Sequence, residues 1–237
     1  MPEQDQVFPR RIWLPSILTA ASIAAGFLSM IVAAGSRFDA AVYLLVLAIV
    51  LDTFDGRVAR WLGATSEFGR ELDSISDAVS SGAAPALLVY LAQLRPLGAV
   101  GIAVTVIYLL AGMYRLARYN VVSDAHSKGR RTLGIPIPIG ASYLMAVVLM
   151  RDQLPAAVAA GVAVLAAVGM ASRWRLPELK GTSLTTAMLG VGILNYLTFV
   201  AWPNWYTVGW WNFWNLLIII VARGEDRRLG VEATVGR

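Results

Sequence analysis

Long apolar runs, separated by short polar segments, dominate the chain. The runs cover roughly residues 12–34, 39–61, 70–94, 97–119, 135–150, 155–171, 185–201 and 205–222. A helix needs about 20 apolar residues to cross a bilayer; several runs reach that length, and the fifth to seventh lie near the lower limit. The pattern therefore predicts an all-α, polytopic membrane protein with about eight transmembrane helices.

The same pattern indicates a single membrane domain over residues 1–237. It has a polar tail at 1–11, transmembrane helices across 12–222 and a second polar tail at 223–237. The first run has an alternative interpretation as a cleaved signal peptide, because Arg10 and Arg11 precede it. Its apolar part of about 20 residues is longer than the ~7–15 of a signal-peptide core, which favours a retained span.

Composition agrees with a membrane protein and excludes several kinds of site. The chain has 237 residues, of which 57% are hydrophobic and 15% are charged, against about a quarter charged in soluble domains. It has no cysteine, which excludes disulfides, thiolate nucleophiles and zinc–thiolate sites. Its one histidine, His126, argues against histidine-cluster metal sites.

The positions of lysine and arginine predict the orientation in the membrane. With the amino terminus placed inside, only Arg37, Arg95 and Arg151 of the 20 basic residues fall in outside segments. This bias places both termini, and the segment from Asp52 to Asp77, at the cytoplasmic face. The net charge of +5 then reflects topology and contact with anionic lipid headgroups, so we expect no nucleic-acid partner.

Four aspartates lie in two pairs at the junctions of apolar runs. Asp52 and Asp55 are spaced i,i+3, and Asp73 and Asp77 are spaced i,i+4, so on helices each pair shares one face. Two such helices in a hairpin would bring four carboxylates together, and their repulsion near a membrane requires cations. Hard divalent cations with oxygen ligands are the natural partners. The alternative is that these acids cap helices or form salt bridges with nearby arginines.

Small residues continue the face that carries the first aspartate pair. Gly56 and Ala59 follow Asp52 by four and seven residues, which leaves room for a bulky ligand such as a nucleotide. Gly69 lies near the start of the next helix, where we expect a phosphate or a close backbone approach.

These residues together resemble a family motif. The spacing Asp52-x2-Asp55-Gly56-x2-Ala59-Arg60-x8-Gly69-x3-Asp73-x3-Asp77 is similar, in every fixed position, to that of the CDP-alcohol phosphotransferases. The resemblance implies a homodimer and two divalent ions, Mg²⁺ or Mn²⁺, held by Asp52, Asp55, Asp73 and Asp77, with Asp77 also serving as general base. The CDP-binding residues that it implies are Asp52, Gly56, Ala59, Arg60, Gly69 and Asp73.

Three further stretches resemble the bacterial and archaeal phosphatidylserine synthases of that family. They are residues 68–86, 114–120 and 134–138, with one departure at Ser81, where those synthases usually carry an aromatic residue. The resemblance implies transfer of a phosphatidyl group from CDP-diacylglycerol to L-serine, by direct attack of the serine hydroxyl and with release of CMP. It also implies a location in the cell membrane of a prokaryote, among membrane lipids.

The second of these stretches holds candidate residues for binding the lipid phosphate or serine. Guanidinium groups fit both phosphate and carboxylate, so Arg115 or Arg118 could bind either; alternatively, both only complement the carboxyl end of their helix. Asn120, Ser81 and Arg131 are further candidates, although the positive-inside bias also accounts for Arg131.

Two alternatives for the function remain open. The acceptor could instead be glycerol phosphate, inositol phosphate or another alcohol, with the same chemistry. The acidic hairpin could also be the ion site of a coupled transporter, which is a different class of protein.

Overall fold

The computed structural model describes residues 13–124, 134–174 and 183–235, and all the regular structure in those ranges is helical. Seven of the helices are separated from their neighbours by turns or loops: α1 (Trp13–Ala34), α2 (Phe38–Trp61), α5 (Ala99–Asp124), α6 (Ile137–Leu149), α7 (Ala156–Ala171), α8 (Ser183–Ala201) and α9 (Trp205–Val235). The remaining segments follow one another directly from Glu67 to Leu97, and we call them the third rod: α3 (Glu67–Asp77), η2 (Ala78–Ala83), α4 (Ala84–Val89), η3 (Tyr90–Leu94) and η4 (Arg95–Leu97).

Each of the eight predicted apolar runs coincides with one of these helices or with the third rod, which confirms the all-α prediction. Three stretches, Trp13–Ala34, Glu67–Leu97 and Ala99–Val121, are long and apolar enough to cross a membrane, and three shorter apolar helices accompany them. The protein is therefore a helical membrane protein, whereas the number of eight spans stays a prediction. The largest difference between a predicted run and the observed helix lies at the carboxyl end of α9. This helix continues to Val235, through most of the predicted polar tail.

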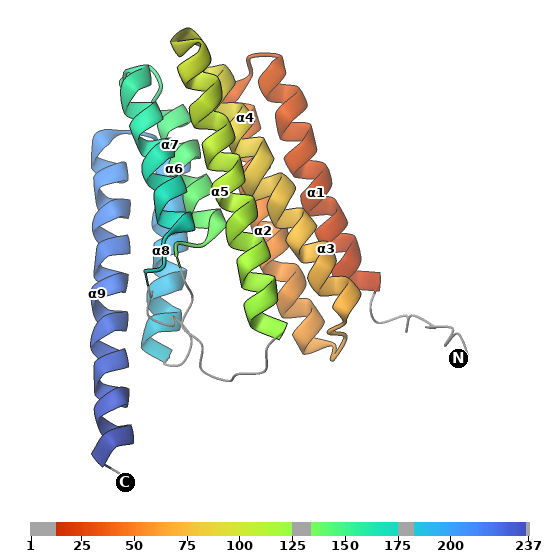
Figure 1. Cartoon of the computed structure of the whole chain (residues 1–237), viewed down its shortest axis with the longest axis vertical. Coiled ribbons are helices and arrows are strands. Elements are labelled where there is room, and N and C mark those ends of the chain that lie inside the picture. Colours follow the sequence, from red (N-terminus) through yellow and green to blue (C-terminus); the bar gives the residue numbers. More distant parts are fainter. Residues whose placement is uncertain (1–12, 125–133, 175–182, 236–237) are drawn as a thin grey trace.

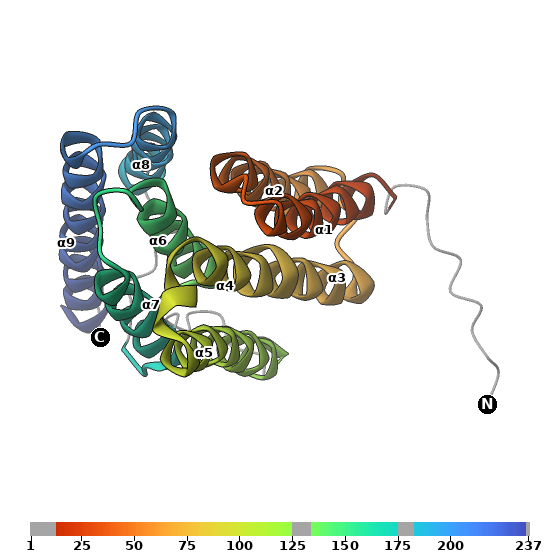
Figure 2. The same ribbon diagram turned by 90° about the horizontal axis from the view of Figure 1, so that it is seen from above.

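The helices run roughly side by side along the long axis of the molecule (Figure 1). Seen from above, α1, α2, α3 and α5 occupy one half, α8 and α9 form the opposite edge, and α4, α6 and α7 lie between them (Figure 2). Side chains of the third rod and of α6 form much of the buried core, including Leu88, Val89, Leu144 and Met145. The third rod thus carries part of the core as well as the second aspartate pair.

Helix α1 packs closely on its neighbours because one of its faces carries small and hydroxyl side chains. Ser22 and Ser29 are fully buried and donate hydrogen bonds to the carbonyl oxygens of Ala48 and Ala41 on α2, both at 2.9 Å. A side chain at Gly26 would meet the Cα atom of Ser80 at 3.0 Å, so the third rod passes α1 at backbone contact. Small residues and hydroxyl hydrogen bonds are the usual means of helix association in membranes.

The turn between α2 and α3 fixes the hairpin that carries the aspartates. The chain leaves α2 after Trp61 and turns through Gly63, whose φ of 59° favours glycine. The Ser66 hydroxyl then accepts a hydrogen bond from the Gly69 N–H at 3.0 Å and caps α3. Because of this cap, α3 begins at Glu67, three residues before the predicted apolar run.

The opposite end of the bundle is fastened by a bidentate ion pair. Arg151, which follows α6, contacts both carboxylate oxygens of Asp39 in the first turn of α2, at 2.6 and 3.1 Å. The hydrogen bonds to Asp39 raise the pKa of Arg151, so its guanidinium stays charged at any physiological pH. This contact joins two helices far from the aspartate hairpin.

Candidate active site

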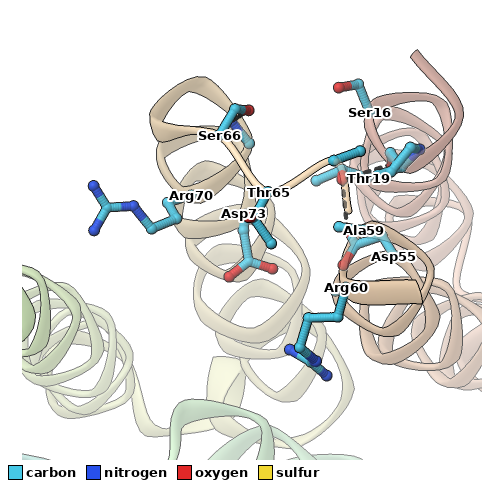
Figure 3. A pocket seen from close by; sticks show the side chains of 13 residues that line it. Ser16, Thr19, Asp55, Ala59, Arg60, Thr65, Ser66, Arg70 and Asp73 are labelled. Atoms are coloured by element: carbon cyan, nitrogen blue, oxygen red, sulfur yellow. Dashed lines mark hydrogen bonds between the residues drawn. The ribbon is translucent and has the colours of Figure 1, made fainter. Parts of the chain in front are cut away.

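Three of the four predicted metal-binding aspartates converge between α2 and α3. One carboxylate oxygen each of Asp52, Asp55 and Asp73 lies within 4.8 Å of the other two. Asp55 is 3% exposed and accepts a hydrogen bond from the Thr19 hydroxyl of α1. In Figure 3, Asp55 from α2 and Asp73 from α3 both point into the space between the two helices. The hairpin geometry predicted from the spacing is therefore present.

Asp77 lies one helical turn beyond Asp73, at the end of α3, and does not belong to that group of three. It is close enough to Asp52, Asp73 and Arg115 to interact with them electrostatically, and the Ser81 side chain lies beside its carboxylate. Asp77 therefore stands beside the group, on the side of the protein interior.

The acidic group fits a divalent cation. Its donors are all carboxylate oxygens, the type that Mg²⁺ and Mn²⁺ prefer. Oδ1 of Asp52 and Oδ1 of Asp77 are buried and have no hydrogen-bond partner among the described residues. Because buried carboxylate oxygens are costly to leave unpaired, these atoms favour an occupant with positive charge.

A cavity of about 180 Å³ opens beside the aspartates. Five of the six predicted CDP-binding residues line it, and Asp52 does not: the five are Gly56, Ala59, Arg60, Gly69 and Asp73. Arg60 also interacts electrostatically with Asp55 and Asp73, and Arg70 forms an ion pair with Glu67 at 3.7 Å. Small residues, the carboxylates of Asp55 and Asp73 and two arginines, Arg60 and Arg70, thus line a single cavity. This lining suits a phosphate-bearing ligand held through a cation.

Gly69 has a structural role next to its place in the cavity wall. A Cβ atom there would lie 3.2 Å from the Ser66 Oγ atom, which is the atom that accepts the Gly69 N–H. A larger residue would therefore press on the cap of α3, and through it on the position of Asp73 one turn later.

Among the candidates for lipid phosphate or serine, Arg115 and Ser81 lie beside Asp77. Arg115 is 7% exposed, lies 5.8 Å from the ring centre of Tyr119, and its Nε atom has no hydrogen-bond partner among the described residues. Ser81 is 1% exposed, and its carbonyl oxygen accepts a hydrogen bond from the Tyr108 hydroxyl at 3.1 Å. The structure thus places a buried guanidinium and a hydroxyl next to Asp77.

The other candidates make structural contacts. Arg118 donates to the carbonyl oxygens of Met170 and Ala171 at the end of α7, both at 3.3 Å. Asn120 donates to the Ser74 hydroxyl of α3 at 3.0 Å. Arg131 lies outside the described residues. A substrate role for these three residues stays a prediction.

Helix α1 contributes to the cavity wall, which the sequence pattern did not predict. Pro15, Ser16 and Thr19 line the cavity together with the α2–α3 turn residues Ala64, Thr65 and Ser66 (Figure 3). The available signal was the spacing of hydroxyl residues at 16, 19, 22 and 29 inside an apolar run, which places them on one helix face.

A second missed contact supports Asp52. The Ser76 side chain lies beside the Asp52 carboxylate, and its hydroxyl donates to the Ser22 hydroxyl of α1 at 3.1 Å. The polar face of α1 therefore contacts Asp55 directly, and through Ser22 it contacts the serine of α3 that lies beside Asp52.

Comparison with known proteins agrees with this geometry. A protein named CDP-diacylglycerol–serine O-phosphatidyltransferase from Helicobacter pylori (strain J99) is 37% identical over 175 residues, which are 70% of this chain and 72% of that one. One of the same name from Bacillus subtilis is 33% identical over 168 residues, 71% of this chain and 92% of that one. An archaetidylserine synthase from Methanothermobacter thermautotrophicus is 32% identical over 187 residues, 77% of each chain. The match to mycobacterial proteins of the first name spans about half of their length.

The family comparison covers the helices that form the site. The CDP-alcohol phosphatidyltransferase family matches residues 12–174, from α1 to the end of α7, and so includes every aspartate and every lining residue of the cavity. With its motif, its helical fold and its carboxylate group in agreement, the chain belongs to the CDP-alcohol phosphatidyltransferase family.

Proposed function

We propose that the protein transfers the phosphatidyl group of CDP-diacylglycerol to the hydroxyl of L-serine, giving phosphatidylserine and CMP. Membership of the family supports the reaction class, and the names of the relatives support serine as the acceptor. The observation that carries the proposal is the group of three carboxylates, Asp52, Asp55 and Asp73, beside a cavity lined by the motif residues.

The carboxylate group would hold two divalent cations, Mg²⁺ or Mn²⁺, with Asp77 as the fourth ligand. When bound, they supply positive charge for the pyrophosphate oxygens and for the phosphate that leaves with CMP. Gly56 and Ala59 leave room for the nucleotide along α2, and Arg60 adds a cation on the same side.

Asp77 is our candidate for the general base. It lies next to the three carboxylates but faces the interior, where Arg115 and Ser81 are its neighbours. In the proposed step the serine oxygen attacks the lipid-side phosphorus, its proton passes to Asp77, and the bond to the CMP oxygen breaks. No covalent enzyme intermediate is needed, because the nucleophile is the substrate hydroxyl itself.

Arg115 is our candidate for binding the serine carboxylate. Its guanidinium is buried beside Asp77 and keeps an Nε–H without a hydrogen-bond partner among the described residues. An arginine fork can bind a carboxylate with two parallel hydrogen bonds. A serine held in this way would present its hydroxyl on the side of Asp77.

We further propose eight spans, with both termini and the active site on the cytoplasmic side of a prokaryotic cell membrane, and a homodimer. The distribution of arginine and lysine supports this orientation. The first turn of α1, the α2–α3 hairpin and the last turn of α9 lie at the same end of the bundle (Figure 1), as an even number of spans requires.

The proposed function is tested by finding which acceptor alcohol supports the release of CMP. Purified protein in detergent is incubated with CDP-diacylglycerol labelled in the cytidine, and CMP release is measured with serine, glycerol phosphate, inositol phosphate and simple alcohols as acceptors. We expect CMP release that depends on serine. Dependence on another alcohol would overturn the choice of acceptor, and ion flux without CMP release would favour the coupled transporter instead.

A further inference from the structure

The Ser81 carbonyl oxygen lies in a part of the third rod that lacks one backbone donor. In a regular α-helix this oxygen would accept the N–H of the residue four positions later. That residue is Pro85, which has no N–H and whose ring crowds the carbonyl group four positions before it. The π-helical segment Ala78–Ala83 ends just before this proline. An α-helical hydrogen bond is therefore not available to the Ser81 carbonyl.

The Tyr108 hydroxyl of α5 supplies a donor for this carbonyl. It donates to the Ser81 carbonyl oxygen at 3.1 Å, and Tyr108 is fully buried. A buried carbonyl without a donor is costly, because no water replaces the lost bond. Helix α5 runs beside the third rod in both views of the molecule (Figure 1, Figure 2), so the bond joins two neighbouring helices.

The neighbours of Tyr108 hold its ring in one place. A Cβ atom at Gly140 of α6 would lie 3.4 Å from the Tyr108 hydroxyl oxygen and 3.6 Å from its Cε2 atom. The backbone of α6 thus packs directly against the tip of the ring, and Tyr108 belongs to the hydrophobic core. In such a close-packed site the hydroxyl stays on the Ser81 carbonyl.

The residue that accepts this bond lies next to the candidate general base. The Ser81 side chain lies beside the Asp77 carboxylate, and Tyr108 is close enough to Asp77 to interact with it electrostatically. Because the carbonyl and the side chain of Ser81 share one stretch of backbone, a fixed carbonyl also limits where the hydroxyl lies. The bond from Tyr108 therefore acts on the surroundings of Asp77.

Tyr108 and Arg115 contact the third rod from one face of α5. They are seven residues apart, which is about two helical turns, so they lie on the same side of the helix. Arg115 lies beside Asp77, and Tyr108 bonds Ser81. The segment from Asp77 to Ser81 is thus held against α5 at both of its ends.

We infer that Tyr108 is a positioning residue for the transfer reaction. Its hydroxyl replaces the donor that Pro85 lacks, and it thereby holds Ser81 and Asp77 in the orientation that the acceptor serine needs. The inference rests on the proposed function, which makes Asp77 the proton acceptor. In this role Tyr108 contacts no substrate and acts through the backbone of the third rod.

Tyr108→Phe tests the inference, because phenylalanine keeps the ring and removes only the hydroxyl. Full-length protein in detergent is assayed for serine-dependent CMP release. We expect kcat to fall by about tenfold and the KM for serine to rise by about threefold, because the group that receives the serine proton is displaced. The KM for CDP-diacylglycerol should not change, since Tyr108 does not line the cavity beside the aspartates. A loss of folded protein would lower kcat alone.

Tyr143→Phe is the matched control. The Tyr143 hydroxyl donates to Asn212 at 3.0 Å and so joins α6 to α9, and Tyr143 does not line the cavity beside the aspartates. Each variant loses one tyrosine hydrogen bond, and the thermal unfolding midpoint reports what that loss costs the fold. We expect Tyr143→Phe to keep the kcat and both KM values of the parent.

Pro85→Ala tests the link between the tyrosine and the proline. Alanine introduces an N–H at residue 85, which can donate to the Ser81 carbonyl in place of Tyr108. In the Pro85→Ala background, Tyr108→Phe should therefore lower kcat by less than about threefold, against about tenfold in the parent, and should lower the thermal midpoint less. Residues that share one contact show this kind of non-additivity.

The results that would overturn the inference are distinct. Tyr108→Phe with the kcat and serine KM of the parent would show that Ser81 needs no tyrosine. A fall in kcat with both KM values unchanged, or an equal change in Tyr143→Phe, would show a loss of folded protein only. Equal costs of Tyr108→Phe with and without Pro85 would show that the hydroxyl does not replace the missing donor. If the parent protein itself releases no CMP with serine, the proposed function fails, and no variant is needed to see it.

Discussion

Replacing Thr19 by valine tests whether α1 belongs to the active site. Thr19 is 4% exposed, and its hydroxyl donates to Oδ2 of Asp55, which is 3% exposed; the hydroxyl also lies 3.0 Å from the Pro15 carbonyl oxygen. Valine keeps the shape and removes the donor. A buried hydrogen bond to a charged group contributes about 1.5–3 kcal/mol, so we expect kcat/KM to fall by about ten- to hundredfold.

The assay is serine-dependent CMP release, measured across a range of Mg²⁺ concentrations. Because Asp55 would be less firmly held, we expect the Mg²⁺ concentration for half-maximal activity to rise together with the loss in kcat/KM. Ser29→Ala is the control, since Ser29 is buried on the same face of α1 but bonds the Ala41 carbonyl, far along the helix from the aspartates. If Thr19→Val keeps the normal Mg²⁺ dependence, or if Ser29→Ala changes it equally, α1 has no special role at the carboxylates.

Three further predictions concern the proposed chemistry. Asp77→Asn should nearly abolish serine-dependent CMP release while the thermal unfolding midpoint stays near that of the parent; a folded variant with normal turnover would refute the role of Asp77. Excess EDTA should remove activity and added Mg²⁺ or Mn²⁺ should restore it, so turnover that persists in the chelator would speak against a metal. Arg115→Lys should raise the KM for serine by about tenfold more than the KM for CDP-diacylglycerol, because lysine lacks the bidentate fork, whereas Arg118→Lys should alter both equally or neither; an unchanged KM for serine would remove Arg115 from the acceptor site.

The helices could be predicted because few backbone structures are stable in the hydrocarbon region of a bilayer. A spanning backbone must satisfy its hydrogen bonds within the segment, so each apolar run becomes a helix. The start of α3 could not be predicted in the same way, because a hydropathy pattern contains no information about helix caps. Ser66 precedes Glu67 and caps the helix through Gly69, a local signal that adds one polar turn before the apolar run begins.

The site could be predicted only where it follows from local spacing. The motif from Asp55 to Asp73 covers two neighbouring helices and one short turn, so its fixed residues line one cavity. Thr19 lies 36 residues before Asp55, and its contact depends on how α1 packs across α2. No local pattern gives that packing.

Two arginines in the carboxyl-terminal half of α5 show the same limit of local spacing. Arg115 and Arg118 are spaced i,i+3, so the sequence treats them as near equivalents. In the structure Arg115 is buried beside Asp77, and Arg118 points to the carbonyl oxygens that end α7. The helices packed around α5 therefore give the two arginines different surroundings. Arg115 is a candidate for the acceptor site, whereas Arg118 joins α5 to α7.

The π-helical segment Ala78–Ala83 explains how the third rod can serve both the site and the core. Asp77 is the last residue before it, and Ser80 and Ser81 within it are almost fully buried. A side chain at Gly82 would meet the Met113 side chain of α5 at 2.6 Å, while Ser80 touches Gly26 of α1 on another side. A wider turn shifts the register of the faces, and such turns are frequent at functional sites. The shift lets the aspartates of α3 face α2, while the next turn is enclosed by α1 and α5 and still offers Ser81 to Asp77.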